Sequence, residues 1–117
     1  MMNWKKRSGL FLILTSIIHN LIGIVIFWEP LVDMFQAGVF NSVAPHYDRS
    51  TLFWFLLSGA LMFILGHFMH WLANELKKEI PPFLGWHLLW LSIVGAFIIP
   101  ASGFWLVLPQ ALIIIKR

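Results

Sequence analysis

Long apolar runs alternate with short polar segments along the chain, and this pattern predicts helices. The first run covers about residues 8–28 and the second about residues 51–72. Each has roughly the 20 residues that a helix needs to cross the hydrocarbon layer of a bilayer. We therefore predict that each of these two runs forms a transmembrane helix.

A third apolar stretch runs from Pro82 to Ile115 and is interrupted at residues 100–103. It is too long for one crossing, so we predict a hairpin of two spans at about residues 82–99 and 101–115. Each arm lies at or below the lower limit of about 17 residues for a spanning helix. A locally thinned bilayer and a re-entrant pair of helices therefore both stay open as alternatives.

The polar segment between the first two runs has its own helix signals. Pro30 suits a first helical position and Gly38 suits a helix end, which predicts a short helix over residues 30–37 at the membrane surface. Asp48 or Ser50 is expected to cap the second span, because a side-chain oxygen satisfies the free N–H groups of a first helical turn. Pro82 is expected to mark the start of the third span.

The basic residues determine the predicted orientation. In the four-span arrangement seven of them share one side and only Arg49 lies on the other; the seven are Lys5, Lys6, Arg7, Lys77, Lys78, Lys116 and Arg117. Basic residues concentrate on the cytoplasmic side of membrane proteins. The predicted fold is therefore a single-domain, all-α, four-helix transmembrane bundle over residues 1–117, with both termini in the cytoplasm.

Composition agrees with a membrane location and excludes several functions. Of the 117 residues, 60% are hydrophobic and 11% are charged, against about 45–50% and 25% in soluble domains. The chain has no cysteine, which excludes disulfides, thiolate metal sites and cysteine nucleophiles. The net charge of +3 comes from residues at span ends, so the expected partner is the lipid bilayer and not nucleic acid.

The first span carries one polar face. At helical spacing five residues fall within an arc of roughly 100°; they are Gly9, Ser16, His19, Asn20 and Gly23. Small residues allow a second helix to approach closely, and Ser16 or Asn20 can bond across the contact. His19 lies near the middle of the span, where polar groups face the bundle interior and are candidates for ligand binding. Hydrogen bonding to neighbouring helices alone is the alternative.

The second span carries His67 and His70 near its cytoplasmic end. A histidine pair at positions i and i+3 can share a metal ion, and one imidazole can bind haem iron. No third ligand is evident in the sequence, so side chains that reach the headgroups are the alternative. His87 on the third span projects away from that span's small-residue stripe, which argues against a clamp between His67 and His87.

Two further places hold polar residues. In the outer loop Asp48 and Arg49 are candidates to close a polar lid over the bundle, converging with Asn41 and the hairpin tip at residues 100–103; a solvated loop with one capping acid is the alternative. Pro109 and Gln110 interrupt the fourth span, and a proline within a span frees one carbonyl that neighbours or water must satisfy.

Three runs of residues resemble a family of small bacterial membrane proteins with four spans and no assigned function. They are residues 39–43 (VFNSV), residues 53–55 (FWF) and residues 100–105 (PASGFW). The resemblance covers most of the chain. It implies a four-span fold in the bacterial cytoplasmic (inner) membrane, and it supplies no catalytic residues.

No motif indicates a reaction, so we expect a non-enzymatic binding or accessory protein. It would hold an apolar ligand or a partner helix between spans one and two, with His19 and Asn20 supplying polar specificity. The small-residue faces of spans one and three are expected to form a homo-oligomer. A haem-binding or other histidine-dependent membrane enzyme is one alternative. A small proton-coupled transporter that uses His19 as its proton carrier is another.

Overall fold

The computed structural model describes residues 4–100 and 103–116, which form five helices and no strand. They are α1 (Trp4–Ile26), α2 (Trp28–Gln36), α3 (Tyr47–Asn74), α4 (Pro82–Ile98) and α5 (Phe104–Ile115). The all-α prediction is confirmed, and so is the short helix in the loop between the first two long helices. Ala101 and Ser102, at the predicted hairpin tip, and Arg117 lie outside the described residues.

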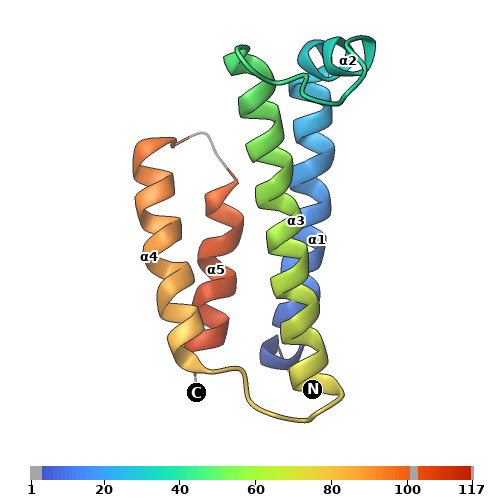
Figure 1. Cartoon of the computed structure of the whole chain (residues 1–117). Helices are drawn as coiled ribbons and strands as arrows, with labels where there is room; N and C mark the ends of the chain where they lie inside the picture. Colours follow the sequence, from blue (N-terminus) through green and yellow to red (C-terminus); the bar gives the residue numbers. More distant parts are fainter. Residues whose placement is uncertain (1–3, 101–102, 117) are drawn as a thin grey trace.

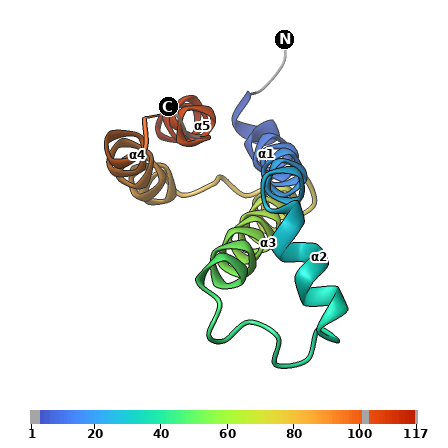
Figure 2. The same cartoon turned by 90° about the horizontal axis from the view of Figure 1, so that it is seen from above.

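The helices form two antiparallel pairs (Figure 1). α1 packs along α3, α4 packs along α5, and the second pair joins the first through contacts between α5 and α1. α3 and α4 do not pack as a helix pair, so the four long helices follow an open arc when seen along the bundle (Figure 2). α2 lies across the ends of α1 and α3 (Figure 1).

Pro30 explains where α1 ends, but in a way the sequence prediction missed. It is the third residue of α2, not the first, because α2 begins at Trp28. Proline has no N–H to donate to the carbonyl four residues earlier, which is the carbonyl of Ile26, the last residue of α1. The chain therefore turns at Phe27, whose N–H still bonds the Gly23 carbonyl at 2.9 Å.

Gly38 ends α2 as predicted. It adopts a positive φ of 89°, the left-handed conformation that commonly follows a helix and that glycine enters without steric cost. The N–H of the next residue, Val39, bonds the Met34 carbonyl at 2.9 Å. Leu31 and Met34 are half-buried, whereas Phe35 is 66% exposed. Contact of this helix with a membrane surface remains a prediction.

The start of α3 corrects a second prediction. The helix begins at Tyr47 with His46 at the N-cap position and no capping side chain, so neither Asp48 nor Ser50 is the cap. Asp48 lies one residue inside the helix, and its carboxylate accepts a hydrogen bond from the Arg49 N–H at 2.9 Å. It therefore satisfies one free amide of the first turn from within that turn.

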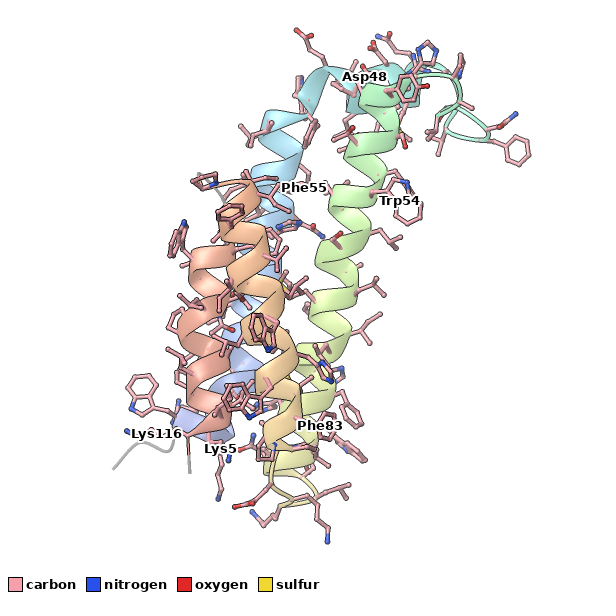
Figure 3. All side chains as sticks on the ribbon, turned by 90° about the vertical axis from the view of Figure 1, so that its left-hand side faces the viewer. Lys5, Asp48, Trp54, Phe55, Phe83 and Lys116 are labelled. Carbon is pink, nitrogen blue, oxygen red and sulfur yellow. The ribbon has the colours of Figure 1, made fainter. Side chains whose placement is uncertain are left out.

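The hydrophobic core lies in the half of the bundle where α1 begins and α5 ends, which we call the base. It joins all four long helices and the loop after α3; its buried members are Leu12, Met69, Ala73, Ile80, Leu88, Val107, Ala111 and Ile114. Ile80 is only 1% exposed although it lies outside any helix. The loop thereby connects the two helix pairs at the base, where Lys5 and Lys116 also lie (Figure 3).

Among the described residues, two helices are long and apolar enough to cross a membrane, α1 with 23 residues and α3 with 28. α4 and α5 are apolar but shorter, with 17 and 12 residues. Within the part of the chain that the structure describes, four complete crossings are therefore not established. The base end of α4 agrees with the sequence, because Pro82 is its first residue.

Candidate functional site

Glycines set the distance between α1 and α3. A Cβ atom added to Gly66 would lie 2.9 Å from the Gly9 carbonyl oxygen and 2.9 Å from the Ile13 nitrogen. A Cβ added to Gly9 would collide with the backbone of His70. Backbone cannot rotate away as a side chain can, so the two helices touch only because both positions are glycine.

His19 bonds to the backbone of the facing helix. Its Nε2 lies 2.9 Å from the carbonyl oxygen of Phe55. A carbonyl only accepts, so Nε2 carries the proton and donates it. The imidazole also stacks on the Phe55 ring, with centroids 3.9 Å apart and an angle of 7° between the planes. His19 is thus held by both the backbone and the side chain of one residue.

Gly59 makes this bond possible. A helical side chain covers the turn that precedes it, so a larger residue at position 59 would shield the Phe55 carbonyl. The Asn20 carboxamide occupies the space that a Gly59 side chain would fill, because a Cβ added there would collide with it. One glycine therefore accommodates two neighbouring polar side chains, His19 and Asn20.

Asn20 has unused hydrogen-bonding capacity. Its Oδ1 is buried and has no hydrogen-bond partner among the described residues. The atom lies along the direction of a Gly59 Cα–H bond, and such C–H···O contacts are much weaker than an N–H···O bond. Most buried polar side-chain atoms in proteins are paired, so the unpaired Oδ1 of Asn20 is an exception within the α1–α3 contact.

A groove of about 440 Å³ lies beside Asn20 between α1 and α3. Its lining is mostly aliphatic and comprises Ser16, Ile17, Asn20, Leu21, Ile24, Gly59, Ala60, Phe63 and Ile64. The Ser16 hydroxyl is already used, since it donates to the Ile13 carbonyl at 2.6 Å. Asn20 is therefore the side chain of this groove that can bond an incoming molecule.

The structure separates the predicted ligand-binding residues into two regions. Ser16 and Asn20 line the groove, and His19 lies next to it at the helix contact. Arg49 lies near the α2 end, where its Nη1 donates to the Ser42 carbonyl at 2.7 Å. Asn41 is exposed in the same loop. The described end of the α4–α5 hairpin stops well short of the level of α2 (Figure 1), so Pro100 and Gly103 do not meet the outer loop.

The other histidines do not converge. His67 is exposed, and His70 is half-buried with its Nδ1 3.2 Å from the Nδ2 of Asn74. His87 is exposed and lies edge-on to Phe83. Among the residues that the structure describes, no group of three or more His, Asp or Glu side chains is placed to hold a metal ion. A metal or haem site at His67 and His70 stays a prediction from the sequence.

The small-residue faces of α1 and α4 pack within the chain, and self-association of the protein stays a prediction. Gly9 and Gly23 of α1 are buried against α3. Gly85 of α4 faces α5, where an added Cβ would lie 2.9 Å from the Ala111 carbonyl oxygen. Ser92 on the same α4 face is fully buried. Neither face is left free to bind a second copy.

Sequence reasoning missed the aliphatic half of the groove, namely Ile17, Leu21, Ile24, Ala60 and Ile64. These residues look like ordinary membrane-facing residues, and nothing in their type distinguishes them. One signal was present: the small pair Gly59 and Ala60 lies opposite the polar pair His19 and Asn20. Small residues opposite a polar pair leave an open space beside the polar side chains. That space can be predicted only once the register of α1 against α3 is known.

Comparison with known protein families shows which family the chain belongs to. The model of DUF6463, a family of unknown function, matches residues 3–117. The chain belongs to this family. No curated protein and no solved structure matches the chain. Membership in DUF6463 agrees with the resemblance seen in the sequence and leaves the function to be argued from the groove.

Proposed function

We propose that this DUF6463 protein is a multi-pass protein of the bacterial cytoplasmic membrane that holds an apolar ligand in the groove between α1 and α3. The ligand class is a lipid-like molecule with one hydrogen-bonding group, such as a hydroxyl or an amide. The free carboxamide of Asn20 inside an apolar groove is the observation that carries this proposal.

The membrane location is supported by lengths and exposure. At 1.5 Å per residue α1 is about 35 Å long and α3 about 42 Å, against about 30 Å for the hydrocarbon layer. Large apolar side chains project outward from the helices, including Val25 at 75% and Phe97 at 86% exposed. Exposed apolar surface on this scale marks contact with lipid or with another protein.

Charge supports an orientation with the base in the cytoplasm. The base carries Lys5, Lys6 and Arg7 at the start of α1, Lys77 and Lys78 after α3, and Lys116 after α5. Among the described residues the α2 end carries a single basic residue, Arg49, with three acids nearby in the sequence. The positive-inside rule then places the base on the cytoplasmic side.

The ligand class follows from the lining. A volume of about 440 Å³ lies within the range of about 300–1,000 Å³ that small-molecule pockets occupy. Aliphatic walls favour a hydrocarbon chain, and the carboxamide of Asn20 favours a partner that donates or accepts one hydrogen bond. The transporter alternative would use the His19 ring for proton exchange, whereas its Nε2 already bonds the Phe55 carbonyl.

Photolabelling tests the proposal. The full chain in liposomes is exposed to a long-chain alcohol that carries a diazirine, and to the matching alkane without the hydroxyl. We expect the alcohol to label the groove segments 16–24 and 59–64 above all other lipid-facing segments. Asn20→Leu should remove the preference for the alcohol over the alkane.

Two neighbouring substitutions provide a matched control. Ala60→Phe fills the groove, whereas Leu61→Phe places the same side chain on an exposed position outside the lining. Groove labelling should be lost in the first variant and kept in the second. Labelling spread evenly over all exposed helix faces, or equal labelling of both variants, would contradict ligand binding. If labelling is absent and a second copy crosslinks through the groove, a partner helix is the occupant.

A further inference from the structure

The α4–α5 hairpin is too short for the bilayer that α1 and α3 would span. At 1.5 Å per residue α5 is about 18 Å long and α4 about 25 Å, against a hydrocarbon layer of about 30 Å. α5 has 12 residues and α3 has 28. Because the hairpin is so much shorter than α3, it cannot reach both ends of that helix. At least one end of the hairpin must therefore lie deeper in the bilayer than the corresponding end of α3.

The structure places most of the difference at the α2 end (Figure 1). α5 ends at the base, where Lys116 lies near the same level as Lys5 (Figure 3). Gln110 of α5 bonds Thr15 of α1 at 2.6 Å, which fixes the register of the two helices. Gly103, seven residues before Gln110, therefore lies about 10 Å further along, near the level of Ile22. Beyond that level α1 and α3 continue without the hairpin (Figure 1).

The hairpin end is polar because it consists of helix termini. The last carbonyls of one helix and the first amides of the next lack partners within their own helices. Pro100 has no N–H to reach the Ala96 carbonyl, and α5 begins without a capping side chain. The Trp105 indole donates to the Pro100 carbonyl at 2.7 Å and the Leu106 N–H to the Gly103 carbonyl at 2.9 Å, which satisfies part of this demand.

The relative costs decide how the membrane meets this end. Leaving one backbone polar group unpaired in hydrocarbon costs several kcal/mol, whereas thinning a bilayer costs a fraction of a kcal/mol per ångström. Thinning by several ångström therefore costs less than keeping more than one such group in lipid. Trp105 at the same end is 55% exposed, and tryptophan side chains favour the boundary between lipid and water. Both observations favour a bilayer surface that descends to the hairpin, and both argue against a hairpin end immersed in lipid.

We infer that the leaflet on the α2 side is locally thinned over the α4–α5 hairpin, so that water reaches Gly103 well below the level of α2. The inference rests on the proposed membrane location. The protein then deforms the surrounding lipid on the face formed by the α4–α5 hairpin. The two faces of the molecule therefore lie in bilayer of different thickness.

Single cysteines test the inference without background, because the chain has none. Gly103→Cys is suited to the test, since nothing lies within 4 Å of an added Cβ there. Ser58→Cys is the depth-matched control. Asn20 meets Gly59, so the neighbouring exposed Ser58 lies close to the level of Gly103 but on the long helix α3. Tyr47→Cys at the α2 end and Lys116→Cys at the base report sidedness.

The full-length variants are labelled with a membrane-impermeant maleimide in intact bacterial cells, and total thiol is measured after denaturation. We expect full labelling of Gly103→Cys and Tyr47→Cys in intact cells, labelling of Lys116→Cys only after the cells are permeabilised, and no labelling of Ser58→Cys in either case. Labelling of Tyr47→Cys alone means that the hairpin end is immersed in lipid, which overturns the inference but leaves the proposed function intact. Labelling of Ser58→Cys means that α3 does not span the membrane, and the proposed function then fails as well.

Discussion

Gly59 organises the polar centre of the α1–α3 contact at the scale of single residues. Its missing side chain exposes the Phe55 carbonyl to His19 and leaves the space that the Asn20 carboxamide fills. Hydrogen bonds between membrane helices contribute about 0.6 kcal/mol on average and at most about 1.7 kcal/mol. The value of this arrangement therefore lies more in fixing the register of α1 against α3 than in total stability.

Substitution of Gly59 tests that arrangement directly. Gly59→Ala should lower the free energy of unfolding by about 1–3 kcal/mol, the usual cost of overpacking, because the new Cβ collides with the Asn20 carboxamide. The double variant Asn20→Ala with Gly59→Ala should be more stable than Gly59→Ala alone, since the colliding group is gone. Thermal unfolding in detergent measures both effects.

Gly103→Ala is the matched control for this experiment. Nothing lies within 4 Å of a Cβ added at Gly103, so its effect should stay within about 0.5 kcal/mol. Equal destabilisation by Gly59→Ala and Gly103→Ala would contradict the contact with Asn20 as the source of the cost, because alanine forms helices better than glycine and would not destabilise by propensity.

The sequence predicted part of the site. Periodicity placed Gly9, Ser16 and Gly23 on one face of α1, and the structure buries all three. It also placed His19 and Asn20 beside them. It did not find the Phe55 carbonyl as the partner of His19, because a backbone acceptor has no sequence signal and becomes accessible only through the glycine one turn later.

At the scale of elements, the α4–α5 hairpin joins α1 through a buried hydrogen bond. Gln110 donates to the Thr15 hydroxyl at 2.6 Å, and Thr15 donates in turn to the Phe11 carbonyl at 2.8 Å. The Gln110 Oε1 is buried without a hydrogen-bond partner among the described residues. The bond therefore fixes the register of the docked hairpin while leaving one costly atom unsatisfied.

A double-mutant cycle measures this link. Thr15→Val and Gln110→Leu, singly and together, should show a coupling energy of about 0.6–1.7 kcal/mol in the free energy of unfolding. Thr15→Val combined with Ser92→Ala is the control, because the Ser92 hydroxyl bonds Leu88 within its own helix and should show no coupling. Zero coupling between Thr15 and Gln110 would mean that this hydrogen bond does not stabilise the docking of the hairpin on α1.

The helices were largely predictable, and their packing was not. Apolar run lengths gave four long segments, and Gly38 marked the end of α2. Pro30 was misread as a helix start because the same residue also ends the preceding helix. The pairing of α4 with α5 was predicted as a hairpin. That this hairpin docks on α1 through α5, with α4 not packed on α3, could not be predicted, since periodicity does not select a contact face when every face of a helix is apolar.

The whole molecule has a strong charge asymmetry, which fixes the predicted topology. The described basic residues lie at the base, apart from Arg49. A fluorescent protein that folds only in the cytoplasm should fluoresce when fused to either terminus. A phosphatase active only outside the cytoplasm should be active when inserted after Phe40, which is 92% exposed in the outer loop. Phosphatase activity at the C-terminus would contradict the arrangement.

The unequal helix lengths also give the molecule a tapered outline. Four helices fill the cross-section at the base, whereas only α1 and α3 continue to the α2 end (Figure 1). In the proposed orientation the protein occupies more area in the inner leaflet than in the outer leaflet. Such a shape relieves stress where the inner leaflet is convex and adds stress where it is concave. The protein would then gather at folds of the membrane that bulge into the cell and be depleted from the cell poles.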